Sequence, residues 1–212
     1  MRRTNTKIVP MVKNLLPEFT SSNWEFDRQE LINDNYSASH YAGESIIPEG
    51  NIMVLYPNGN YSECYSSPIE SKWPYLTVGH TYYLRWLSRK ERTESGDQGT
   101  ANIDEDVYWP EVPNPILQGV NSSHYTRFRK NSYIFTLQQS QWPDTTVVDG
   151  PQKIRFDCNN RRKYVHYFVL ADFMLIDLTA TYAERGLEIP TLSDLTSRPY
   201  FSGRIELADW HN

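Results

Sequence analysis

The sequence predicts an all-β protein: a jelly-roll β-sandwich with an N-terminal arm and short helical turns near the C-terminus. Two observations support this prediction. About ten short extended runs alternate with turns rich in Gly, Pro and Asn, and no long segment has a helical period. In addition, the most apolar run of the chain, residues 164–178, has the composition of a buried strand.

This run, YVHYFVLADFMLIDL, is rich in β-branched and aromatic residues and contains neither Gly nor Pro. Both of its alternating sets of side chains are largely apolar. We therefore expect both faces of a central strand to be covered, one by a facing sheet and the other by a loop, a terminal segment or a partner. Because the run is longer than an ordinary strand, we predict a bulge near Ala171 and Asp172 that turns Asp172 out of the core.

The other expected elements follow in chain order. We predict strands at 14–19 (broken by Pro17), 37–41, 51–56, 61–65, 80–88, 101–109, 123–129, 133–138 and 153–158. The turn Pro57-Asn58-Gly59-Asn60 indicates a hairpin that joins the third and fourth of these strands. In the strand at 80–88, alternation places Tyr82, Leu84 and Trp86 on one face, which we assign to the core, and Tyr83 and Arg85 on the solvent face.

The charged, Gly-containing segment 89–99 is expected to be a mobile loop. After residue 179 the pattern changes, and helical turns are expected at 180–184 and 191–197, the second with Thr191 or Ser193 as its N-cap. The chain then ends in a tail with three aromatic anchors, Tyr200, Phe201 and Trp210.

The domain organisation is expected to be simple. A chain of 212 residues is long enough for one large β domain. We predict an arm at 1–13, the sandwich at 14–179, and an extension at 180–212 that packs on the sandwich or on a neighbour. The segments 1–13 and 200–212 are the ones we expect to contact a neighbouring subunit, so self-association is expected.

Charge and cysteine content exclude some classes of function. A net charge of -5 argues against nucleic acid as the main partner, because no basic excess is present to displace counterions. No apolar stretch follows Arg2 and Arg3, so we expect neither a signal peptide nor membrane insertion. Cys64 and Cys158 do not make a disulfide framework, and we expect free thiols, with a bridge between the two as the alternative.

Aromatic residues make up 14% of the chain, which suits either a sugar-binding surface or ordinary core packing. A sugar site needs a flat aromatic face and planar hydrogen-bonding groups. The candidates lie on the expected solvent face of a strand or beside prolines and turns: Trp73, Tyr75, Tyr83, Arg85, Tyr108, Trp109 and Trp142. No GxSxG, HExxH or P-loop motif is present, and the five histidines lack metal-ligand spacing, so catalysis is not expected.

Several segments of the chain resemble the carbohydrate-binding-module-like domains of bacteriophage and prophage tail or minor structural proteins. They are NLLPEF (14–19), GHTYYLRW (79–86), VYWPEVPNP (107–115), KIRFDCNN (153–160) and ADFMLIDLTATYAERGLEIPT (171–191). The last is the specific one: Asp172 precedes Met174-Leu175-Ile176 and Asp177-Leu178-Thr179, and Pro199-Tyr200-Phe201 closes the domain. The chain departs from the pattern at Ala183-Glu184-Arg185, where the family usually has a Gly-rich turn.

The resemblance implies a galactose-binding-like jelly roll located on a virion. It also implies a structural calcium ion, held by Asp172 together with Glu18 and Glu44. The predicted function is therefore a non-enzymatic structural or decoration component of a phage or phage-like particle, in the tail, baseplate or a head fibre. Its expected partners are other virion proteins, copies of itself and a host surface glycan. A free carbohydrate-binding lectin and a glycan-cleaving enzyme are the alternatives.

Overall fold

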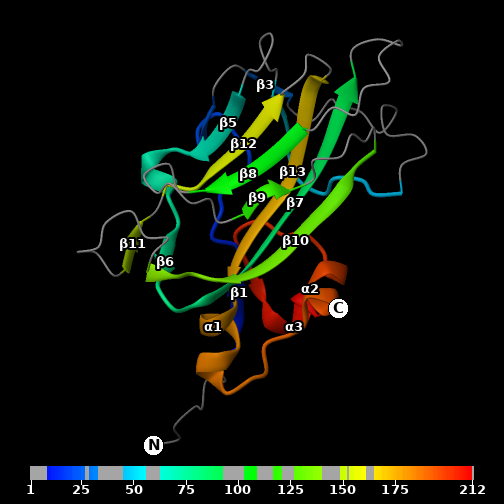
Figure 1. Cartoon of the computed structure of the whole chain (residues 1–212). Helices are drawn as coiled ribbons and strands as arrows, with labels where there is room; N and C mark the ends of the chain where they lie inside the picture. Colours follow the sequence, from blue (N-terminus) through cyan, green and yellow to red (C-terminus); the bar gives the residue numbers. More distant parts are fainter. Residues whose placement is uncertain are drawn as a thin grey trace, which may run out of the picture.

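Two five-stranded antiparallel sheets form the body of the protein (Figure 1). The computed structural model describes residues 9–26, 29–32, 45–55, 63–92, 103–108, 117–120, 127–139, 149–151, 153–160 and 165–211. The first sheet consists, in spatial order, of β10 (Arg129–Thr136), β7 (Thr81–Arg92), β13 (Val165–Asp177), β4 (Ile52–Leu55) and β3 (Gln29–Ile32). The second consists of β2 (Trp24–Phe26), β5 (Glu63–Pro68), β12 (Arg155–Asn160), β8 (Ile103–Tyr108) and β9 (Leu117–Val120). The predicted all-β, jelly-roll sandwich class is confirmed.

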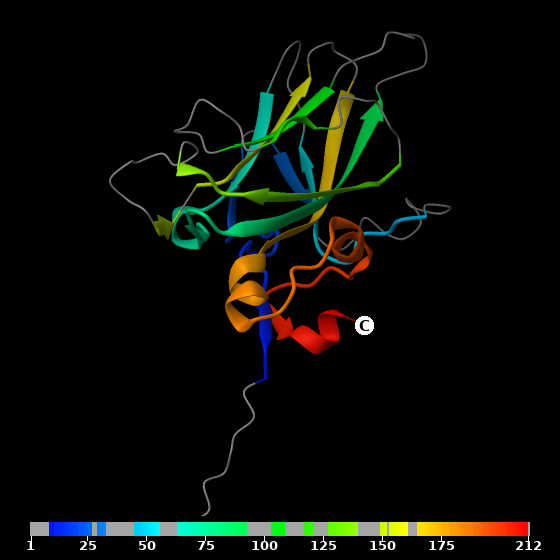
Figure 2. The same ribbon diagram turned by 60° about the horizontal axis from the view of Figure 1, so that its bottom comes forward.

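Smaller elements lie at the edges and at one end of this sandwich. Two short strand pairs join β1 (Met11–Lys13) to β14 (Arg204–Glu206), and β6 (Tyr75–Thr77) to β11 (Asp149–Pro151). The helical elements are η2 (Glu70–Lys72), α1 (Leu178–Thr181), η4 (Ala183–Arg185), α2 (Leu192–Ser197) and α3 (Leu207–Trp210). In the turned view of Figure 2 the orange and red C-terminal elements gather beside blue β1, at one end of the sheets.

Strand β13 occupies the centre of the first sheet, as the apolar run predicts, and pairs with β7 on one side and β4 on the other. Its inner face contributes Phe173 and Leu175 to the core between the sheets, where Trp24, Trp86 and Phe156 are also buried. Its outer face is covered as well. Near its end Met174 and Ile176 pack under the C-terminal elements, and nearer its start Val169 and Ala171 pack with Leu87 and Phe128.

The predicted bulge is present. The pairing of β13 with β7 shifts by one residue between Ala171 and Met174, and Asp172 adopts a left-handed conformation with φ 54°. Simple alternation would place Asp172 on the inner face with Leu170, and the extra residue removes it from that position. The carboxylate is nevertheless buried, because it lies against the segment before β4 rather than in solvent.

Strand β7 follows the predicted alternation, but the assignment of its second face is wrong. Tyr82, Leu84 and Trp86 face the inner core as expected. Tyr83 and Arg85, predicted to face solvent, are 0% and 1% exposed. The C-terminal elements cover this face: the Tyr83 hydroxyl donates to the carbonyl of Leu195 at 3.2 Å.

Three other expectations about individual strands need correction. Strands β4 and β5 do not form the hairpin that the turn at 57–60 indicates, because they belong to different sheets. The first strand covers residues 11–13 rather than 14–19. Strand β7 extends to Arg92, into the segment expected to be a loop.

The two cysteines of the chain occupy paired positions. The register places Cys64 of β5 directly opposite Cys158 of β12, which their spacing in the sequence did not indicate.

The C-terminal residues pack on the sandwich of their own chain. Helix α2 begins with the predicted cap at Thr191, which forms a reciprocal capping box with Asp194. Phe201, Leu207 and Trp210 are buried with Val12 in one apolar cluster. These aromatic anchors are therefore used within the chain, and contact of residues 1–13 and 200–212 with a neighbouring subunit stays a prediction. In the described part of the chain, no helix has the length and apolar character that a membrane crossing requires.

Candidate functional site: a groove beside Tyr75

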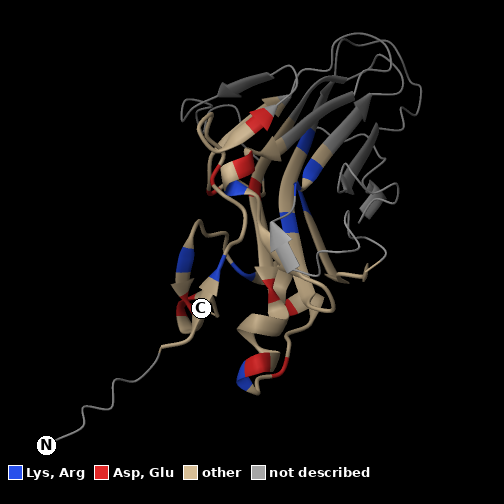
Figure 3. Ribbon diagram, turned by 90° about the vertical axis from the view of Figure 1, so that its left-hand side faces the viewer, with Lys and Arg blue, Asp and Glu red and all other residues tan. Residues whose placement is uncertain are grey.

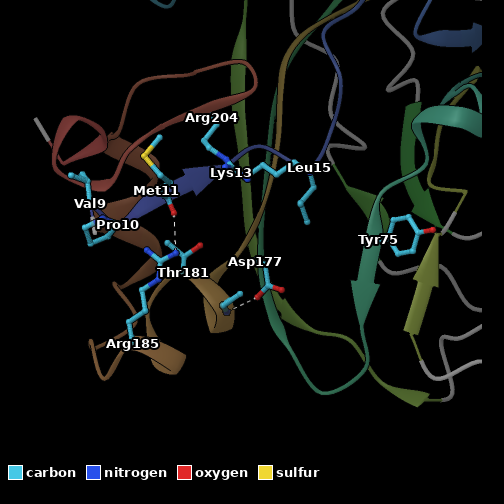
Figure 4. A pocket seen from close by; sticks show the side chains of 11 residues that line it. Val9, Pro10, Met11, Lys13, Leu15, Tyr75, Asp177, Thr181, Arg185 and Arg204 are labelled. Carbon is cyan, nitrogen blue, oxygen red and sulfur yellow. Dashed lines mark hydrogen bonds between the residues drawn. The ribbon is translucent and has the colours of Figure 1, made fainter. Parts of the chain in front are cut away.

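Two adjoining hollows run along the N-terminal segment and meet at Tyr75. The first, of about 580 Å³, is lined by residues 9–11, 13 and 15 and by parts of α1, η4 and β14. The second, of about 490 Å³, is lined by residues 13–18, by Ser202 and Gly203, and by the segment from Ser71 to Tyr75. Lys13, Leu15 and Tyr75 line both, so we treat them as one surface, the Tyr75 groove (Figure 4).

The local sequence explains why Tyr75 projects outward. In β6, Leu76 is 1% exposed and enters the core, so its neighbour Tyr75 must point to the opposite side. Tyr75 is 72% exposed, which leaves its ring free to meet a ligand. Trp73, two residues earlier, is half-buried and fixed, because its indole N–H donates to the carbonyl of Pro68 at 3.1 Å.

The wall opposite Tyr75 is held by one buried side chain, Asn14. Its amide nitrogen donates to the carbonyls of Phe173 and Phe201, at 2.9 Å and 3.1 Å. Its amide oxygen accepts from the backbone N–H groups of Leu16 and Leu175, at 3.1 Å and 3.0 Å. These four bonds tie the groove wall to β13 and to the C-terminal segment, so the groove is built on a rigid part of the fold.

The first hollow is rich in positive charge. Lys13 and Arg204 are exposed and are direct cross-strand partners in the β1–β14 pair, and Arg185 of η4 lines the same hollow. Its acidic residue, Asp177, is already engaged: one oxygen accepts from the Ala180 backbone N–H at 2.9 Å, and the other lies 2.8 Å from His80 Nδ1. Figure 3 shows blue ribbon segments of lysine and arginine close to the C-terminus, with red acidic segments beside them.

A second cluster of polar groups surrounds Asp172. One carboxylate oxygen accepts from the backbone N–H groups of Glu49 and Gly50, at 3.1 Å and 2.7 Å, and the other from that of Glu49 at 3.1 Å. Gly50 permits this close approach, because a Cβ there would lie 2.6 Å from the Tyr200 ring. Burial raises the pKa of Asp172, and the two amide hydrogen bonds oppose that effect.

Arg85 is the cation that faces this cluster from β7. Its guanidinium donates to the carbonyl of Arg198 at 2.6 Å and lies 3.9 Å from the Glu49 carboxylate. Burial of Tyr200, with the nearby charges of Asp172 and Glu18, raises the pKa of the Tyr200 phenol. The cluster therefore joins β7, β13, the segment before β4 and the C-terminal segment, which is a structural role.

The described residues do not by themselves make the calcium site that the resemblance implies. Glu18 lines a further hollow of about 440 Å³ with Glu49, Asn51 and Tyr200, but Asp172 is not part of its lining, and the oxygens of Asp172 accept from amide donors. Nowhere in the described ranges do three His, Cys, Asp or Glu side chains form a group that could hold a metal. Glu44 lies outside those ranges, so the calcium site stays a prediction.

The structure brings together two of the sequence-derived glycan candidates, Trp73 and Tyr75, in the groove. It removes Tyr83 and Arg85 from the surface, because the C-terminal elements cover them. Tyr108 ends β8, but its side chain is outside the described part. The last two candidates, Trp109 and Trp142, lie outside the described residues.

Sequence reasoning missed the cations of the groove. Lys13, Arg185 and Arg204 stand far apart in the sequence and carry no shared motif. Only the pairing of β1 with β14, and the packing of η4 beside them, unites them. Arg185 donates to the carbonyl of Met11 at 3.2 Å, which fixes one side of the hollow.

Comparison with known proteins leaves the family open. No protein-family model matches the chain, and no curated protein matches it. Among solved structures, the arabinose-bound MgGH51 α-L-arabinofuranosidase is similar over 82% of this chain, with 9% identity and a TM-score of 0.47. The chain spans 27% of that protein's length.

Two further structures illustrate the range of the similarity. The CBM22-1 xylan-binding domain of Paenibacillus barcinonensis Xyn10C is similar over 81% of this chain and 97% of its own, with 7% identity and a TM-score of 0.43. The enzymatically active domain of bacteriophage CBA120 tailspike protein 4 is similar over 76% of this chain and 21% of its own, with 8% identity and a TM-score of 0.40. At these identities the likeness concerns the fold alone.

Proposed function

We propose that the protein is a non-catalytic glycan-binding subunit of a phage or phage-like particle and that the Tyr75 groove is its sugar site. The observation that carries the sugar-binding half is the exposed ring of Tyr75, which lines both adjoining hollows. An aromatic face can stack on the C–H side of a pyranose, and neighbouring polar groups can bond its hydroxyls. The groove provides both kinds of group.

The second hollow supplies the polar groups that such a ligand requires. Lys72, Asn23, Ser71 and Ser202 line it together with the carboxylate of Glu18. Trp73 adds a second aromatic ring whose position is fixed by its bond to Pro68. Two rings with a single residue between them in the sequence, one fixed and one exposed, suit an extended oligosaccharide better than a single buried sugar.

The particle half of the proposal is supported by the resemblance of residues 171–191 and 199–201 to domains of phage tail and minor structural proteins. A particle displays many copies of each subunit, so a weak site in each copy is sufficient for firm attachment to a host surface. The tail, the baseplate and a head fibre are the positions that fit this role.

Removal of the Tyr75 ring tests the sugar site. Tyr75→Ala is expected to weaken binding to a glycan that the wild type recognises by about tenfold or more, since exposed aromatic anchors dominate such surfaces. Tyr75→Phe keeps the ring and is expected to retain most of the affinity. Titration calorimetry on a ligand first found by glycan array measures both.

Two controls accompany this test. Ile134→Ala removes another exposed apolar side chain, 37% exposed on β10 and outside the groove, and is expected to leave affinity unchanged. Because Tyr75 is largely exposed, Tyr75→Ala is expected to change the free energy of unfolding by less than about 0.5 kcal/mol. Unchanged affinity in Tyr75→Ala would contradict the groove as the sugar site.

The particle assignment is tested separately. Mass spectrometry of purified particles from the producing strain is expected to detect the protein in stoichiometric amounts. Absence from the particles, with sugar binding intact, favours a free lectin instead. Release of reducing sugar from host wall material by the purified protein, abolished by a single carboxylate substitution, favours a glycan-cleaving enzyme.

A further inference from the structure

We propose that the Tyr75 groove prefers sugars that carry a carboxylate or phosphate group, and that Lys13 and Arg204 hold this group. The inference rests on the proposed sugar site and names the class of glycan that it takes. The observation behind it is a pair of like charges at directly opposed positions of the β1–β14 ribbon, on a wall of the hollow.

Opposed positions in an antiparallel pair place two side chains on the same face with their Cβ atoms about 5 Å apart. Like charges at such positions repel each other and destabilise the pairing. Val12 and Ile205, on the other face of the ribbon, pack into or against the C-terminal apolar cluster, so the ribbon cannot turn over to separate the two cations. An anion between Lys13 and Arg204 removes this repulsion.

Neither cation has a carboxylate partner among the described residues. Glu206, two residues beyond Arg204 on the same face, opposes Met11 and forms no ion pair in the described part of the chain. The hollow's own acidic residue, Asp177, caps α1 and contacts His80. Three cations, with Arg185 as the third, therefore face one engaged carboxylate.

The chemistry of the cations fits a planar or tetrahedral oxyanion. The fork of an arginine guanidinium bonds two oxygens of a carboxylate or phosphate at once, and a lysine adds a compact positive charge. Arg204 is exposed, so its guanidinium is free to adopt this geometry, whereas Arg185 is partly committed to the carbonyl of Met11. Tyr75, on the rim of the same hollow, offers a ring for the sugar that bears the anion.

The charge of the whole protein makes this site unusual. The formal net charge is -5, so the overall field repels polyanions and gives no general affinity for them. Binding of an acidic glycan must therefore depend on the local cations. This dependence separates a specific site from nonspecific attraction.

Matched glycans test the inference. Oligogalacturonate and its methyl ester share one sugar backbone, and in the ester each carboxylate is replaced by a neutral methyl carboxylate. A phosphorylated mannan before and after phosphatase treatment provides the corresponding comparison for phosphate. Each charged probe is expected to bind about tenfold or more tightly than its neutral counterpart, and to weaken as NaCl is raised from about 50 to 500 mM. The pair of probes with the larger ratio of charged to neutral affinity shows whether the site prefers a carboxylate or a phosphate.

The variants link the preference to the cations. The double variant Lys13→Gln/Arg204→Gln is expected to lose the charge preference and to keep the affinity for the neutral probe. Arg127→Gln, a change at an exposed arginine that lines neither hollow, is expected to keep both. Urea unfolding of each variant checks that the fold is retained.

The outcomes separate the two proposals. Equal affinity for charged and neutral probes, with binding lost in Tyr75→Ala, overturns the anion preference and leaves the sugar site intact. A charge preference that persists in the double variant also overturns the role of Lys13 and Arg204. Failure of the wild type to bind any charged or neutral glycan overturns both proposals.

Discussion

Asp172→Ala is expected to lower the free energy of unfolding by about 3–5 kcal/mol, because it removes a buried charge that several groups share. The backbone N–H groups of Glu49 and Gly50 lose their acceptor. Arg85, which is 1% exposed, loses the attraction of a buried negative charge. Alanine is also strained at φ 54°. Urea denaturation followed by tryptophan fluorescence measures the loss.

Asp172→Asn is the matched control. Asparagine tolerates the left-handed conformation and keeps an oxygen that can accept from both amides. Its expected loss is about 1 kcal/mol, well below that of alanine. Equal losses for the two variants would contradict the role of the amide acceptor.

The difference in stability between the wild type and Asp172→Asn is expected to depend on pH, because the pKa of Asp172 is raised in the folded protein. The folded protein binds the proton at Asp172 more tightly than the unfolded chain, for which the ordinary pKa is 3.8. The stabilisation that this linkage provides is therefore complete below the ordinary pKa and is lost as pH rises through the folded pKa. The stability of the wild type relative to Asp172→Asn is expected to fall as pH rises from below 3.8 through the raised pKa of Asp172 in the folded protein. A difference in stability that does not change with pH is the contrary result.

Trp210→Ala is expected to cost about 3–5 kcal/mol of stability, in the range of large-to-small core substitutions. The indole is fully buried although it lies close to the end of the chain. It packs edge-on against Phe201 with ring centroids 5.7 Å apart, and the Arg198 guanidinium lies 4.6 Å from its centroid. Its N–H donates to the carbonyl of Pro199 at 3.3 Å.

The loss in Trp210→Ala is expected to be accompanied by detachment of the C-terminal elements from the outer face of the first sheet. Limited proteolysis should then cleave after residue 180 at protease concentrations that leave the wild type intact. Leu192→Ala, on α2 of the same region but 41% exposed, is the control and is expected to change stability by less than about 0.5 kcal/mol. Wild-type resistance in Trp210→Ala would mean that the C-terminal elements are held by other contacts.

The central strand was predictable because its signal is local. Residues 164–178 are apolar on both alternating faces, and this alone requires cover on both sides. The bulge followed from the length of the run and from a carboxylate, Asp172, in its middle. The cap at Thr191 followed from an equally local pattern.

The covered face of β7 was not predictable in the same way. Alternation says which side chains share a face, but it does not say what lies over that face. Tyr83 and Arg85 are polar at their tips, which favours a solvent-facing assignment. Their burial depends on the C-terminal elements that pack over them. The hairpin predicted from the turn signal at 57–60 was wrong for a related reason, since a turn signal does not specify which sheet the chain enters next.

The groove was half predictable. Trp73 and Tyr75 stand beside Pro74, and aromatic residues at such turns are typical of exposed binding surfaces. Lys13 and Arg204 come from opposite ends of the chain, and their positions carried no signal until β1 was found to pair with β14. Pairing over such a sequence separation depends on the whole fold rather than on either segment.

The pairing of β1 with β14 also has a practical consequence for any assay of this protein. The carbonyl of Pro10 accepts a backbone hydrogen bond from Leu207 at 2.8 Å, so the two described ends of the chain lie together, at the end of the sheets where Figure 1 labels β1 and α3. Val9 itself lines the first hollow. An affinity tag or fluorescent protein joined directly to Val9 would therefore stand at the edge of the groove and would obstruct large polysaccharides. Immobilising the protein through a label at the other end of the sheets leaves the groove open to large polysaccharides.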